Sequence, residues 1–189
     1  MEKEPEKLVM KKKRNIVSDD MRLRLLSNRH GRLTTQQWLT LVAEPLVPIL
    51  LLTAPAILIF GPRLAAMARI LPLLMLLGVV LLGAMLITRA RRYARKPLRF
   101  AVLHAEKDGA TIWQFWKRPT LQTRSGIVLK FNKSIAPPLS IKQGQTYIAY
   151  FLVDTDRYIL LSIAPADHPD AESWYPANAF AKRHGEVFD

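Results

Sequence analysis

The chain has 189 residues, half of them hydrophobic, and 28 Lys and Arg against 15 Asp and Glu give a formal net charge of +13. It contains no cysteine, which excludes disulfides, thiolate metal sites and cysteine nucleophiles. The apolar residues are concentrated between residues 41 and 88 rather than spread along the chain, so we do not expect one evenly built globular domain.

The first 33 residues are highly charged and hold too few apolar side chains to build a core, which predicts a basic, disordered cytoplasmic tail. Residues 21–29 alternate Leu with Arg, a pattern that also suits a short amphipathic helix. Cations in this tail and near residue 96 are candidate contacts for anionic lipid, the alternative being a solvated surface. These candidates are Lys11, Lys12, Lys13, Arg14, Arg95 and Lys96.

Two apolar runs follow, 41–60 and 70–88, with a break at Gly61-Pro62-Arg63. Each run is close to the roughly 20 apolar residues needed to cross a hydrocarbon core of about 30 Å. Residues 34–97 therefore predict a two-helix transmembrane hairpin that ends at Pro97. The hairpin predicts an integral protein of a bacterial inner or plasma membrane. Because Lys and Arg flank the hairpin on its outer sides, the positive-inside rule predicts that both termini are cytoplasmic.

Glu44 is the one acidic residue of the first run, and a carboxylate inside a membrane is costly unless it is paired. The arginines that follow the second run, Arg89, Arg91 and Arg92, are its candidate partners in an intramembrane ion pair. A role for Glu44 in an ion or proton pathway is the alternative.

After Pro97 the pattern changes to short runs of β-branched and aromatic residues separated by turn signals. We expect strands at 98–104, 111–116, 126–131, 146–152 and 158–163, the last two joined by a turn at Asp154-Thr155-Asp156. Five short strands within residues 98–164 predict a small antiparallel β-barrel of the SH3-like or OB-like type in the cytoplasm.

Residues 165–189 form an acidic, aromatic C-terminal tail, which either packs on its own domain or binds a partner. Trp174 and Tyr175 in this tail, with Trp116 in the barrel segment, are candidate partner-binding residues. The four histidines show no metal-ligand spacing, and we expect no cofactor and no catalytic or metal site.

The sequence contains no catalytic motif. It predicts a non-enzymatic membrane protein whose barrel is a binding or scaffolding module, for example an accessory subunit of a membrane complex. Its expected partners are membrane lipids and another protein or a second copy, with nucleic acid disfavoured. The alternatives are an oligomeric channel or transporter subunit, and a membrane tether for anionic lipid or nucleic acid.

Overall fold

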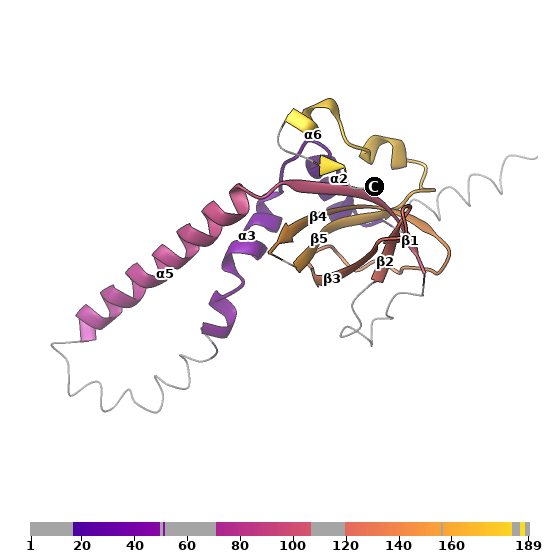
Figure 1. Ribbon diagram of the computed structural model, residues 1–189. Coiled ribbons are helices and arrows are strands. Elements are labelled where there is room, and N and C mark those ends of the chain that lie inside the picture. Colours follow the sequence, from indigo (N-terminus) through magenta and orange to yellow (C-terminus); the bar gives the residue numbers. More distant parts are fainter. Residues whose placement is uncertain are drawn as a thin grey trace, which may run out of the picture. The chain divides into compact units, whose positions relative to one another are not determined.

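The computed structural model describes residues 17–49, 51, 71–106, 120–155, 157–182 and 186–187, and the chain divides into two compact units (Figure 1). The first unit joins the described part of Met1–Thr34 to that of Lys96–Asp189, and the second is Thr35–Arg95. The first unit is therefore discontinuous in sequence. This differs from the predicted arrangement, in which the first 33 residues form a tail separate from the barrel.

The sheet of the first unit contains six strands in the part of the chain that is described. They are β1 Leu98–Ala105, β2 Thr120–Thr123, β3 Val128–Ser134, β4 Thr146–Asp154, β5 Arg157–Pro165 and β6 Glu186–Val187. Their order is β2-β3-β5-β4-β1-β6, and β2 also pairs with β1, so that β1 to β5 close into a barrel (Figure 1). The predicted small β-barrel is confirmed, although the strand expected at 111–116 lies outside the described residues.

Two pairs of neighbouring strands are parallel, β3 with β5 and β1 with β6, and the other pairs are antiparallel. The prediction of a wholly antiparallel barrel is therefore wrong. Around the barrel the strand order is β1-β2-β3-β5-β4-β1, with β3 parallel to β5. A barrel fold by itself does not assign a function.

The barrel interior is filled by aromatic side chains from strands that do not pair with each other. The rings of Phe131 on β3 and Phe151 on β4 lie edge to face, with 5.7 Å between centroids, although β5 separates these strands in the sheet. Phe131 and Phe151 are both fully buried, as are Leu103 and Leu129. Edge-to-face packing of this kind adds roughly 0.5–1.5 kcal/mol to the area term.

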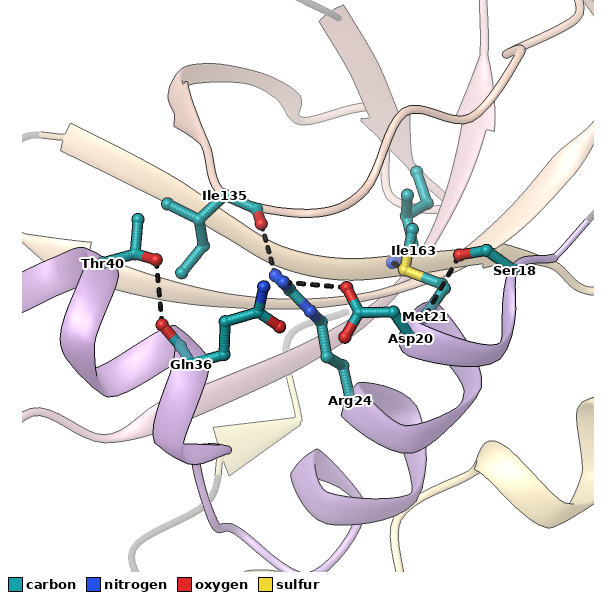
Figure 2. Close-up of polar contacts among 8 residues, drawn as sticks. All are labelled: Ser18, Asp20, Met21, Arg24, Gln36, Thr40, Ile135 and Ile163. Carbon is teal, nitrogen blue, oxygen red and sulfur yellow. Dashed lines mark hydrogen bonds and ion pairs between the residues drawn. The ribbon is translucent and has the colours of Figure 1, made fainter.

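Helix α2, Asp19–Asn28, packs on β5 and begins with a side-chain cap, since the Met21 amide donates to Ser18 Oγ at 3.3 Å (Figure 2). Its buried positions are 21, 24, 25 and 28, which is the spacing of one helix face. Arg24 is 5% exposed, and its guanidinium bonds both to Asp20 Oδ2, 2.9 Å away, and to the carbonyl of Ile135. At the end of the helix, Asn28 Nδ2 donates to Ser162 Oγ on β5 at 2.8 Å.

The C-terminal segment packs on the same domain through η2 (Ala171–Trp174), α6 (Asn178–Lys182) and β6. The Tyr150 hydroxyl donates to the Trp174 carbonyl at 2.7 Å, and the ring of Phe180 lies 5.7 Å from that of Tyr150. Because this segment and α2 cover their outer faces, β4 and β5 are buried on both sides along most of their length.

The second unit contains α3, Thr35–Ala43, and α5, Leu71–Ala94, which pack together. Helix α3 ends before a turn at Glu44-Pro45, so the described part of the first apolar run is not one continuous helix. Residues 50 and 52–60 of that run, and the break at 61–63, lie outside the described residues. In α5, the uncharged run that begins the helix ends at Thr88, and arginines follow at Arg89, Arg91 and Arg92.

Within the ranges that the structure describes, no helix combines the length and the apolar character needed to cross a membrane. This finding overturns the predicted transmembrane hairpin. The predicted location in a bacterial inner membrane, with two spans and two cytoplasmic termini, depended on that hairpin and is corrected with it.

Candidate functional site

The outer side of β3 differs from the covered strands β4 and β5. Along β3 the side chains alternate between buried Leu129 and Phe131 and exposed Val128 and Lys130. This alternation is typical of a strand with one face on the core and one in solvent.

The turn between β2 and β3 places two more exposed side chains next to this strand. Gly126 has φ +87°, a conformation that favours glycine, and its amide donates to the Thr123 carbonyl at 3.0 Å. Thr123 Oγ1 accepts from the Ile127 amide at 3.0 Å and lies 2.9 Å from Ser125 Oγ. These bonds fix the backbone on either side of Arg124, which is exposed, and of Ile127, which is 47% exposed.

We call Arg124, Ile127, Val128 and Lys130 the β2–β3 surface. It contains two cations and two exposed apolar side chains, and residues 120–134 include no Asp or Glu. A surface of this composition suits a ligand that offers both apolar and acidic groups. These four residues are not among the predicted site residues, although the sequence contains an Arg-Ser-Gly turn followed by an alternating run.

In the second unit, the structure brings Glu44 and Arg89 together. Arg89 Nη2 donates to Glu44 Oε2 at 2.8 Å and to the Leu41 carbonyl at 3.1 Å, and its guanidinium lies 5.7 Å from the centre of the Tyr93 ring. Leu41 is in the last turn of α3, whose carbonyls have no partner within the helix, so Arg89 caps that helix. Because the two side chains are 29% and 47% exposed, solvent screens this pair.

The other basic residues, predicted either to pair with Glu44 or to contact anionic lipid, lie in different environments. Arg91, Arg92 and Arg95 are exposed, whereas Lys96 Nζ lies 3.6 Å from Asp154 Oδ1 and so pairs within the first unit. The cations at 11–14 lie outside the described residues.

Of the three aromatic residues predicted to bind a partner, Trp174 is 2% exposed, and its ring centroid lies 4.6 Å from that of His168. Tyr175 is 39% exposed and packs against Phe100, with 5.6 Å between centroids. Trp116 lies outside the described residues. Trp174 therefore holds the C-terminal segment to the barrel. Of these two residues, Tyr175 is the one whose side chain is exposed to solvent.

Tyr150 is the buried titratable group beneath that segment. Burial raises the pKa of its hydroxyl above the ordinary value of 10.0, and the positive charge of Arg29 opposes this rise in part. The neutral hydroxyl is the form that donates to the Trp174 carbonyl. We assign Tyr150 a structural role.

The predicted turn at 154–156 is supported at Thr155, which has φ +59°, while Asp156 lies outside the described residues. Among the residues that the structure does describe, no three His, Cys, Asp or Glu side chains gather as a metal site would require. The β2–β3 surface is thus the candidate site that the barrel offers.

Comparison of the chain with protein-family models, with curated proteins and with solved structures gives no match.

Proposed function

We propose that this protein is a binding module, with a binding rather than a catalytic role, and that its barrel holds a protein partner at the β2–β3 surface. The observation that carries the proposal is a pair of exposed cations beside a pair of exposed apolar side chains, on a barrel whose β4–β5 side is covered by the chain's own α2 and C-terminal segment.

The partner segment that fits this surface carries acidic side chains beside apolar ones. Lys130 and Arg124 supply long-range attraction, which raises the association rate. Ile127 and Val128 supply the apolar area, since their exposed fractions of 47% and 52% are large for β-branched side chains. The turn that holds Ile127 is already hydrogen-bonded in the free protein, so little ordering entropy is lost when it binds.

The test compares the full chain with the double variant Ile127→Asp/Lys130→Glu as bait in lysate of the source cells. The matched control is Leu23→Asp/Lys142→Glu, which makes the same kinds of change at exposed positions elsewhere in the first unit. We expect a protein that co-purifies with the wild type and the control, and whose recovery falls at least tenfold with the β2–β3 variant.

Equal recovery by the two double variants would refute the proposed surface. Circular dichroism on all three proteins checks that each is folded. Parallel samples are treated with nuclease and eluted over a salt series, because binding to nucleic acid falls steeply with salt. Recovery that depends on nucleic acid would replace the protein partner with a nucleic acid.

A further inference from the structure

The C-terminal segment takes its structure from the surface on which it lies. Its elements η2, α6 and β6 contain four, five and two residues. Isolated helices shorter than about 12–15 residues are only marginally stable in water, so η2 and α6 would not persist without the barrel. The segment is therefore held on the barrel as a short peptide ligand is held on a protein (Figure 1).

Two buried aromatic side chains anchor the segment. Trp174 is 2% exposed and Phe180 is 1% exposed, whereas the residues between them, 175–179, are half-buried or exposed. Protein interfaces concentrate their binding energy in a few buried anchors of this kind, which are surrounded by contacts of little energetic weight.

An aromatic pair of the barrel lies beneath these anchors. Phe100 on β1 and Tyr150 on β4 are directly opposite each other, with 5.1 Å between ring centroids. The ring of Phe180 packs edge to face on that of Tyr150, and the Tyr150 hydroxyl donates to the Trp174 carbonyl at 2.7 Å. The pair therefore contacts both anchors of the segment.

Arg29, which follows α2, holds the main chain of the segment. Its carbonyl accepts from the Ala177 amide at 3.0 Å, and its guanidinium donates to the Ser173 carbonyl. These bonds use main-chain groups that any peptide offers, so selectivity for a sequence depends on the aromatic anchors. We call Arg29, Phe100 and Tyr150 the β1–β4 face.

We propose that the β1–β4 face is a second peptide-binding site, which the chain's own C-terminal segment occupies in the resting protein. Its ligand is a segment of a partner protein that carries Trp and Phe at the spacing of Trp174 and Phe180. The fit of the chain's own segment defines this chemistry. The site shares no residue with the β2–β3 surface.

The C-terminal segment acts as an autoinhibitory cover of this site. A tethered segment has an effective concentration of about 1 mM, so a free ligand competes poorly until the segment opens. Arg29 Nε is buried and has no hydrogen-bond partner in the described part of the chain, and a buried donor of this kind opposes the closed state.

Hydrogen exchange of the full wild-type chain tests whether the segment opens by itself. The Ala177 amide bonds to the Arg29 carbonyl, and the Phe180 amide bonds to the Ala177 carbonyl at 2.8 Å. After correction for intrinsic rates, both amides should exchange at least 100-fold faster than those of β4, because local opening precedes global unfolding. Equal protection would show that the segment opens only with the barrel and would overturn the proposal.

A labelled peptide of residues 166–182 tests the site in trans by fluorescence anisotropy. It should bind full-length Trp174→Ala/Phe180→Ala at least tenfold more tightly than the wild type, because the variant's own segment has lost its anchors. The matched control, Glu172→Ala/Lys182→Ala, changes two exposed side chains of the same segment and should bind the peptide as the wild type does. A peptide that carries alanine at both anchor positions should bind none of the three proteins.

Failure of the peptide to bind a folded double variant, or equal binding of the peptide without anchors, would overturn the site. Circular dichroism checks folding, and the exchange measurement on the wild type decides the matter alone if the double variant is unfolded. Light scattering should give the wild type its monomer mass of 21.5 kDa. A dimer that the double variant abolishes would assign the site to a second copy and refute a partner protein as its ligand.

Discussion

The substitution Leu25→Ala tests whether the N-terminal segment belongs to the barrel domain. Leu25 is 0% exposed on the face of α2 that packs on β5, and the predicted disordered tail would have left it in solvent. Removing a fully buried leucine side chain costs 2–5 kcal/mol, because transfer energy is lost and a cavity remains. We expect a loss of about 3 kcal/mol in the free energy of unfolding, or about 10 °C in Tm for a domain of this size.

The matched control is Leu23→Ala on the same helix, where the side chain is 64% exposed. The same chemical change there should alter the free energy of unfolding by less than about 0.5 kcal/mol. Unfolding of the full chain in urea is followed by circular dichroism and by tryptophan fluorescence, to which buried Trp174 contributes. Equal effects of the two substitutions, or no effect of either, would refute the packing of α2 on β5.

Two further predictions concern pairs of polar groups. In a double-mutant cycle with Glu44→Gln and Arg89→Met, we expect a coupling energy below about 1 kcal/mol, because both side chains are partly exposed; a coupling of several kcal/mol would contradict the solvent-screened pair. For Tyr150, the raised pKa means that the unfolded chain releases the phenolic proton at lower pH than the native state, so stability should fall as pH rises above about 10. Tyr150→Phe should lower the free energy of unfolding by about 1 kcal/mol at pH 7, because the Trp174 carbonyl loses this donor. The same substitution should reduce the loss of stability at alkaline pH. Urea titrations from pH 8 to 11 measure this loss, and an unchanged loss in the variant would show that another group causes it.

The barrel strands were predictable where local pattern and tertiary structure agree. The alternation at Leu129 and Phe131 and the turn at Thr155 each report local geometry, and β3, β4 and β5 were found within a few residues. Ile127 continues the alternation of Leu129 and Phe131 in the sequence, but it is exposed, because the turn at Gly126 directly precedes it and β3 begins one residue later. The parallel pairing of β3 with β5 depends on connections between distant residues, which no local pattern encodes.

The sequence suggested α2 as a short amphipathic helix at residues 21–29, but its burial against the barrel was not predicted, because half of its buried face is polar. Positions 21, 24, 25 and 28 have helical spacing, but they hold Met, Arg, Leu and Asn, so the apolar signal is diluted. Arg24 and Asn28 are tolerated inside because Asp20, the Ile135 carbonyl and Ser162 supply partners for them. For α5, hydropathy alone suggested a membrane span. Its contact with α3 includes Arg89, which bonds to the Leu41 carbonyl and lies next to Tyr93. An average of hydropathy along the helix scores such a charged residue as exposed, so it does not reveal this contact.

The hydrogen bond between Asn28 and Ser162 joins residues 134 positions apart in the chain. At a synthesis rate of about 5–20 residues per second, α2 leaves the ribosome roughly 7–27 seconds before the strand it covers. During that interval Met21 and Leu25 have no barrel to pack on, and the whole of Thr35–Arg95 is synthesised in between. The nascent chain therefore exposes two apolar stretches at once, and its dependence on chaperones should be greatest before β5 is complete.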